Sequence, residues 1–161
     1  MSASKSRNEL FFNSLSIFVM ILTYIFVAVS FTDLPDEIPT HFGLDMEVDR
    51  LGPKLMIWIL PIINTLVLGL SLALRKGEDY VNLPFIKSDK LRSEGLRYYF
   101  EMLSSINFMT SLTFAYISYV TVYSEYQSLL PLFITSICFL IFAVIGFYMF
   151  LFHKISLQDT Q

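Results

Sequence analysis

A polar segment between two apolar stretches carries the residues whose types and spacing could do chemistry. His41, Asp45 and Asp49 recur every four residues, so they would share one face if this segment were helical. One imidazole with carboxylates suits hard or borderline divalent ions, which makes a metal site at these residues one interpretation. The segment holds one histidine, so a catalytic zinc site with several imidazoles is not expected. Apart from such a divalent metal, no cofactor is expected.

The same residues support an enzyme only weakly. His41 and Asp49 could form a general-base pair, but no serine or cysteine nucleophile stands near them in a recognisable motif. The apolar stretches hold no paired aspartates and no glycine-rich phosphate loop. We therefore expect a protein that is not an enzyme. A metal-dependent membrane enzyme using His41 and Asp49 is the main alternative from another class.

Recognition of a ligand is the interpretation that the charge of the segment favours. Residues 32–54 hold six acidic and two basic side chains, a net charge of −4, and such a field attracts cationic peptides. Pro35 and Pro39 each fix one backbone angle and disfavour helix in the residue before them. Used structurally instead, His41 and Asp49 would pair with each other or with Lys54. The residues expected to bind a ligand or to organise the segment are Pro35, Pro39, His41, Phe42, Asp45, Asp49, Gly52 and Lys54.

The composition of the chain indicates which kind of protein carries this segment. Of the 161 residues, 55% are hydrophobic and 16% are charged, against about 25% charged in soluble domains. A soluble fold of this size could not bury so much apolar surface, so we predict an integral membrane protein. The one cysteine, Cys138, lies in an apolar stretch, which excludes an intramolecular disulfide and a thiolate metal site.

Four stretches are long and apolar enough to cross a bilayer as helices, which takes about 20 residues. They predict an all-α integral membrane fold, a single domain over 1–161 built as a four-helix bundle, with a structured, proline-rich, acidic loop at 32–54. The predicted spans are residues 11–31, 55–74, 98–123 and 129–152. Pro61 is expected to kink the second span, with Asn64 and Thr65 close by to satisfy freed backbone groups.

The basic residues predict the orientation. Nine of the eleven lysines and arginines lie in the N-terminal tail, the 75–97 connection and the C-terminal tail. The positive-inside rule places these three segments in the cytoplasm and the 32–54 loop outside the cell membrane. The 75–97 connection could lie along anionic headgroups or dock a cytoplasmic regulator, and the residues do not separate these two interpretations.

A stripe of small polar residues marks one face of the third span. Ser104, Asn107, Ser111 and Ser118 follow a spacing of three to four residues, which favours a helix–helix interface over a substrate path because none of them ionises. We expect Asn64, Ser104, Asn107 and Ser111 to pack helices together. A small transporter, or an accessory subunit of one, is a second and weaker alternative, since four short helices without central charges offer little for ion coupling.

The 32–54 segment also resembles the signature of a known family. The matching residues are Leu34-Pro35, Ile38-Pro39, His41-Phe42, Asp49, Gly52 and Lys54, followed by an apolar helix with Pro61. They resemble the DUF1648 family of small bacterial membrane proteins, whose domain also occurs in SdpI-type immunity proteins that protect bacilli from a secreted toxic peptide. The resemblance covers about residues 15–75. The family pattern has Asn after the His-Phe pair and Gly three residues later, where this chain has Gly43 and Met46.

This resemblance implies a function and partners. It implies immunity or sensing toward a secreted antimicrobial peptide, or toward a similar envelope stress, through the outer loop of a bacterial membrane protein. The expected partners are the lipid bilayer and either a cationic peptide or another membrane protein. The chain has no run of lysine and arginine of the kind that would suggest binding to nucleic acid.

Overall fold

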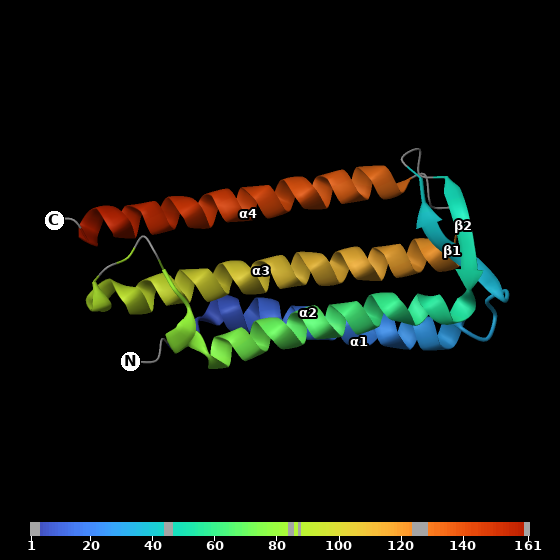
Figure 1. Cartoon of the computed structure of the whole chain (residues 1–161), viewed down its shortest axis with the longest axis horizontal. Coiled ribbons are helices and arrows are strands. Elements are labelled where there is room, and N and C mark those ends of the chain that lie inside the picture. The colour runs from blue at the N-terminus through green and yellow to red at the C-terminus, as the bar shows by residue number, and fades with distance from the viewer. Residues whose placement is uncertain (1–3, 44–46, 84–85, 87, 124–128, 160–161) are drawn as a thin grey trace.

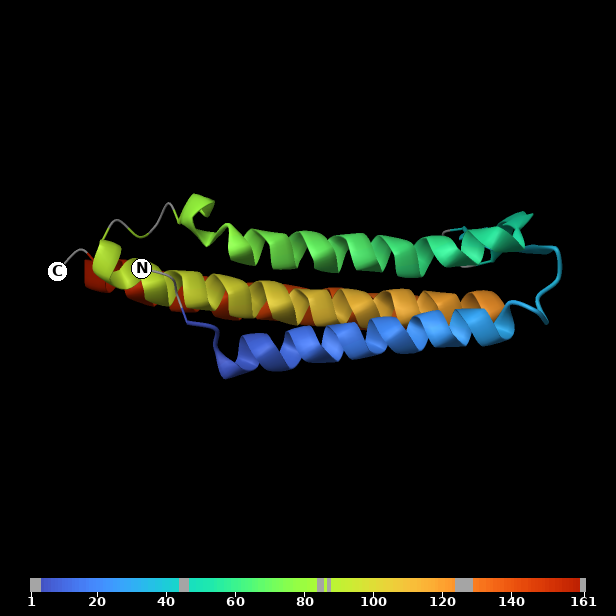
Figure 2. The same cartoon turned by 90° about the horizontal axis from the view of Figure 1, so that it is seen from below.

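In the part of the chain that the structure describes, four long helices lie side by side in one elongated bundle (Figure 1, Figure 2). The computed structural model describes residues 4–43, 47–83, 86, 88–123 and 129–159. The start of α1 and the end of α4 lie at one end of the bundle, the terminal end, and the strands lie at the other, the hairpin end. The elements are α1 (Arg7–Ser30), β1 (Glu37–Phe42), β2 (Val48–Pro53), η1 (Lys54–Trp58), α2 (Ile59–Lys76), η2 (Glu78–Tyr80), α3 (Asp89–Val122) and α4 (Leu130–Asp159).

Three helical segments in the described part of the chain are long and apolar enough to cross a membrane. They are Arg7–Ser30, Lys54–Lys76 and Pro131–Gln158, which contain most of the predicted spans 11–31, 55–74 and 129–152. The chain is therefore a multi-pass membrane protein. Helix α4 continues to Asp159, so the polar residues expected to form a C-terminal tail extend the helix instead.

The predicted third span, 98–123, lies in α3, which starts earlier in the polar connection and is not among these three apolar segments. Helix α3 packs against α1, α2 and α4, and its small polar side chains lie in those contacts. None of the exposed large apolar side chains of the described residues lies within α3, whereas α1, α2 and α4 each carry several. The polarity of α3 thus follows from its position between the other helices. That α3 crosses the membrane stays a prediction.

The segment between α1 and α2 folds as a two-stranded antiparallel hairpin, so the all-α expectation is wrong for these residues. Glu37 pairs with Pro53, Pro39 with Leu51 and His41 with Arg50, and the register shifts on both sides of His41. Proline is tolerated here because neither strand has a second neighbour that would need its missing N–H. The helical face proposed for His41, Asp45 and Asp49 does not form: His41 and Asp49 lie on opposite strands, and Asp45 is outside the described residues.

The start of α2 differs from the expected kinked span. A 3-10 turn, η1, follows Pro53 and passes directly into α2, which places Pro61 in the first turn of that helix. A proline there lacks only an N–H that the helix would leave without a partner. Thr65 donates to the Pro61 carbonyl oxygen at 2.8 Å, as expected for a side chain that satisfies backbone near a proline.

Candidate functional site

A small apolar cluster packs the hairpin against the helices. Val27 of α1, Leu34, Ile38 of β1 and Ile57 of η1 form this cluster, and Val27, Ile38 and Ile57 are almost fully buried. Burying a large aliphatic side chain contributes about 1.5–3 kcal/mol, so Ile38 alone gives the short hairpin a substantial anchor. The strands are therefore a fixed part of the hairpin end rather than a free loop.

Polar contacts of the predicted residues brace the same hairpin. The Lys54 backbone N–H donates to the Asp36 carbonyl oxygen at 2.9 Å, and the Lys54 ammonium lies 3.4 Å from the Asp36 carboxylate. That ammonium also lies 5.5 Å from the centre of the Phe31 ring. A Cβ at Gly52 would come within 2.9 Å of the Thr40 methyl group, so the close pairing of the strands requires glycine there. Pro35 is exposed at the start of the segment.

His41 and Asp49 form a hydrogen-bonded pair across the two strands. Nδ1 of His41 lies 2.6 Å from Oδ1 of Asp49, and about half of each side chain or more is exposed, at 62% and 52%. A carboxylate on Nδ1 fixes the orientation of the ring and leaves Nε2 for another partner. Within the described residues no three histidine, cysteine or acidic side chains gather as a metal site would need.

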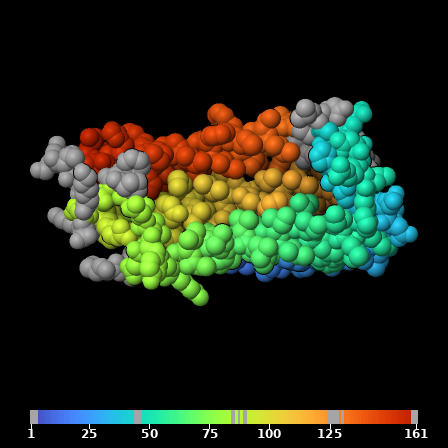
Figure 3. All heavy atoms as spheres, in the orientation of Figure 1, coloured from blue at the N-terminus to red at the C-terminus, as the bar shows by residue number. Residues whose placement is uncertain are grey.

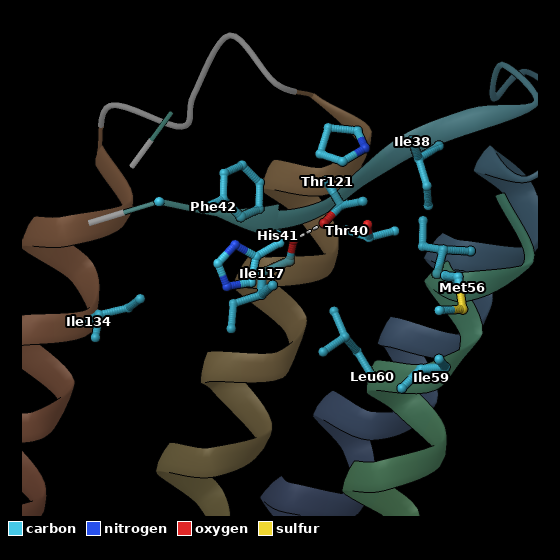
Figure 4. A pocket seen from close by; sticks show the side chains of 13 residues that line it. Ile38, Thr40, His41, Phe42, Met56, Ile59, Leu60, Ile117, Thr121 and Ile134 are labelled. Atoms are coloured by element: carbon cyan, nitrogen blue, oxygen red, sulfur yellow. Dashed lines mark hydrogen bonds between the residues drawn. The ribbon is translucent and has the colours of Figure 1, made fainter. Parts of the chain in front are cut away.

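A cavity of about 430 Å³ lies beneath β1 at the hairpin end (Figure 4). Five elements line it: β1, η1 and the facing turns of α2, α3 and α4. The walls include Met56, Ile59, Leu60, Ile117 and Ile134, and β1 adds Pro39, Thr40, His41 and Phe42. Its size falls in the range of small-molecule sites, about 300–1,000 Å³. We call this space the hairpin cavity.

Figure 4 shows how the polar groups are placed around the hairpin cavity. The His41 ring and the Ile117 side chain lie next to each other below β1, with Leu60 and Ile59 further along the wall. The Thr121 hydroxyl donates to the Ile117 carbonyl oxygen at 2.9 Å, and the Thr40 hydroxyl donates to the Arg50 carbonyl oxygen at 3.3 Å. Both hydroxyls thus have partners in the protein, and among the lining residues that the structure describes His41 is the one ionisable side chain.

Three of the residues expected to pack helices, Asn64, Asn107 and Ser111, make hydrogen bonds between α2 and α3. Ser111 donates to Asn64 Oδ1 at 3.1 Å, and Asn107 donates to the Ser71 hydroxyl at 2.7 Å. Ser104 instead donates to the Glu101 carbonyl oxygen within its own helix, at 2.9 Å. Ser71 was missed by the sequence reasoning because it stands alone among apolar residues, without the repeat that marked α3.

A buried ion-pair cluster at the terminal end was also missed. Arg75 at the end of α2 donates from Nε to Glu9 of α1 at 2.8 Å, and it also pairs with Glu78 of η2. All three side chains are at least nine-tenths buried, and the guanidinium lies 4.6 Å from the centre of the Phe100 ring. Glu9 Oε2 has no hydrogen-bond partner among the described residues. The sequence pointed to this cluster only by placing an acid, Glu9, at the start of the first apolar stretch and an arginine, Arg75, at the end of the second.

The basic 75–97 connection is therefore not a uniform charged surface. Arg75 is buried, Arg92 donates to the Asp79 and Val81 carbonyl oxygens at 3.2 and 2.9 Å, and Arg97 lies over the Tyr98 ring. The side chains of Lys87 and Lys90 are outside the described residues. Two of the charges that suggested headgroup binding, Arg75 and Arg92, thus hold the connection to the helices.

Comparison with known proteins places one part of the chain in a family. A protein of Archaeoglobus fulgidus, described as an uncharacterized protein, is 26% identical over 162 residues, covering 91% of this chain and 88% of the relative. No solved structure matches. The family model described as "Domain of unknown function (DUF1648)" matches residues 18–65, which run from within α1 through the hairpin to the first half of α2. The resemblance seen in the sequence is confirmed: residues 18–65 are a DUF1648 domain.

Proposed function

We propose that the hairpin and the hairpin cavity bind a cationic amphipathic peptide, and that the protein provides immunity to such a peptide or senses it as an envelope stress. In this proposal the protein lies in a bacterial cell membrane with both termini in the cytoplasm and the hairpin outside. The observation that supports it best is the cavity itself. It joins an apolar interior to a hairpin that exposes the acidic side chains of Glu37 and Asp49, and this hairpin lies within the segment that carries the family signature.

The charges of the hairpin end suit a cationic ligand. Glu37, Glu47 and Asp49 are exposed on or beside the strands, and Asp33 is exposed just before them. Acidic groups around an opening raise the local concentration of cations and speed their association. The apolar wall below would hold the other face of an amphipathic peptide, where burial of apolar area supplies affinity. The acidic side chains thus suit the cationic face of the peptide, and the apolar wall suits its apolar face.

The test is the survival of a sensitive bacterium exposed to a panel of cationic antimicrobial peptides, with and without this protein. His41→Ala, Asp49→Ala and the double variant are compared at equal membrane levels, verified by immunoblot. We expect protection by the wild type and its loss in the variants, with the double variant no worse than either single change because the two side chains act as one pair. Absence of protection against every peptide would remove the immunity proposal.

A divalent metal at His41 is a second candidate, favoured by one observation. The bond from Nδ1 to Asp49 is the arrangement in which a carboxylate orients a metal-binding imidazole, leaving Nε2 as the ligand. Elemental analysis of the purified protein tests this candidate. A stoichiometric metal that is lost in the His41→Ala variant would favour a metal site at His41. It would also support a metal-dependent enzyme as the function. Metal retained in that variant would exclude His41 as the ligand.

A further inference from the structure

We infer that the ligand of the hairpin cavity is a membrane-inserted amphipathic segment whose apolar side enters sideways, from the bilayer, between α2 and α4. This inference rests on the proposed function, because it names the state of the ligand and its route into the same cavity. It follows from how polarity is distributed around the cavity and from where the cavity meets the surface.

Most of the polar side chains among the described lining residues lie on the β1 side of the cavity. His41 and Thr40 belong to β1. Thr121 of α3 also lines the cavity, and its hydroxyl donates a hydrogen bond to the Ile117 carbonyl oxygen of the same helix. The opposite wall, which includes Ile59 of α2, Ile117 of α3 and Ile134 of α4, is aliphatic. A ligand entering past this wall meets no group that needs to be desolvated.

The aliphatic side of the cavity is continuous with the surface of the bundle. Met56 and Ile59 line the cavity and are still 45% and 41% exposed. From there α2 carries further exposed aliphatic side chains, Ile62, Ile63 and Leu66. Helices α2 and α4 lie on opposite sides of α3 at the cavity (Figure 4), and the space-filling view shows α3 between them along the same face (Figure 3). In a membrane protein this face meets lipid chains.

An amphipathic helix bound to a membrane is the ligand class that fits such an opening. Helices of this kind lie in the interface with the apolar face buried about 5–10 Å and the cationic face toward water. That depth matches a cavity placed directly below β1 and open toward lipid. The acidic hairpin would face the cationic side while Ile59 and Ile134 contact the apolar side.

The experiment measures access to single cysteines in the full-length protein in lipid vesicles. Cys138 is the chain's one cysteine, so Cys138→Ser gives the background. Ile134→Cys places a thiol on the α4 wall of the cavity, and Leu132→Cys is the matched control, two residues away on the same helix and 68% exposed. Each variant is treated with an apolar maleimide that partitions into lipid and, separately, with a charged thiol reagent confined to water.

We expect the apolar reagent to label both variants and the charged reagent to label neither efficiently. The probe ligand is a synthetic helix of leucine and lysine with all its lysines on one face. At saturation it should slow the apolar labelling of the Ile134→Cys variant about tenfold and leave the Leu132→Cys variant unchanged. An oligolysine of the same charge should protect neither. Faster labelling of the Ile134→Cys variant by the charged reagent would overturn the inference, because the cavity would then open to water.

A second readout separates failure of the inference from failure of the proposed function. Trp58 is the only tryptophan, and it packs on Tyr24 and Phe31 next to the cavity residues Ile57 and Ile59, so its fluorescence reports ligand binding at the hairpin end. If the probe peptide changes Trp58 emission without protecting the Ile134→Cys variant, the sideways route is wrong and hairpin recognition stands. If neither signal responds to the peptide, the proposed peptide recognition fails as well.

Discussion

At the scale of single residues, the structure separates side chains that hold the protein together from those that face a ligand. His41 and Asp49 are exposed at the hairpin, whereas Glu9, Arg75 and Glu78 are buried at the terminal end. A buried ion pair is stable only while its charges compensate each other, and removing one partner leaves the others uncompensated. Loss of Arg75 would thus leave the buried carboxylates of Glu9 and Glu78 without the cation that they share.

Arg75→Ala should lower the free energy of unfolding by about 3–5 kcal/mol, because Glu9 and Glu78 would lose the cation that lies between them. Unfolding of the purified protein in mixed micelles, followed by circular dichroism, measures the change. Lys76→Ala is the matched control, since Lys76 is the next residue along the chain and is exposed. Equal effects of the two substitutions would show that the cluster contributes nothing specific.

A glycine in α3 offers a second prediction at this scale. A Cβ at Gly95 would lie 2.3 Å from Cδ1 of Ile86 and 3.0 Å from Cδ1 of Leu83, so these two side chains pack against α3 at a point without a side chain. Gly95→Ala should therefore destabilise the protein by about 1–3 kcal/mol, the usual range for overpacking. Adding Ile86→Ala should recover most of the loss, since the nearest clash is with the end of that side chain.

The control for this prediction is Gly146→Ala in α4, where a Cβ would meet nothing within 4 Å. Helix propensity alone then favours alanine by about 1 kcal/mol. The two substitutions, identical in chemistry, should change stability in opposite directions in the same unfolding assay. Destabilisation by both would point to backbone effects rather than to the contact with Ile86.

At the scale of elements, α3 joins the other three helices and uses polar side chains to do so. Its Asn107 and Ser111 bond to α2, while the outer helices direct aliphatic side chains away from the bundle. Helices in lipid associate through close packing and hydrogen bonds because burial of apolar surface gives no net driving force there. The seam between α2 and α3 is therefore expected to fix the position of α2, whose first turn lines the hairpin cavity.

A double-mutant cycle on Asn107→Ala and Ser71→Ala tests this seam. We expect a coupling free energy of about 0.6 kcal/mol, and at most about 2 kcal/mol, the range found for hydrogen bonds between membrane helices. Unfolding of the four proteins in the same micelles gives the value. Additive effects of the two substitutions would mean that the 2.7 Å contact adds no stability of its own.

The elements that could be predicted from the sequence were those marked by long runs of apolar residues. The spans at 11–31, 55–74 and 129–152 were readable because a bilayer demands long apolar runs. The hairpin was missed because strands of six residues containing proline give little periodicity. The motif containing His41 and Asp49 was identified, but the hairpin cavity was not. Its wall residues, Met56, Ile117 and Ile134, lie far apart in the chain and become neighbours only in the fold.

At the scale of the whole molecule, the arrangement of the helices limits the topology. The start of α1 and the end of α4 both lie at the terminal end, so the chain between them must run along the bundle an even number of times. Three of the helices are apolar enough to cross a membrane, and α3, with 34 residues and thus about 51 Å of length, is long enough to supply the fourth crossing. Its polar residues meet other helices rather than lipid, which removes the main cost of placing them there.

This topology predicts which residues a charged, membrane-impermeant thiol reagent can reach in intact cells. In the Cys138→Ser background, Glu37→Cys marks the hairpin end and Tyr80→Cys marks the terminal end, where Tyr80 is 93% exposed. With the hairpin outside, as the acidic and basic segments predict, only the Glu37→Cys variant should be labelled until the cells are broken open. The reverse pattern would invert the orientation and place the hairpin cavity out of reach of any secreted peptide. Labelling of both variants in intact cells would contradict a membrane crossing by α2, because the two ends of that helix would then face the same side of the membrane.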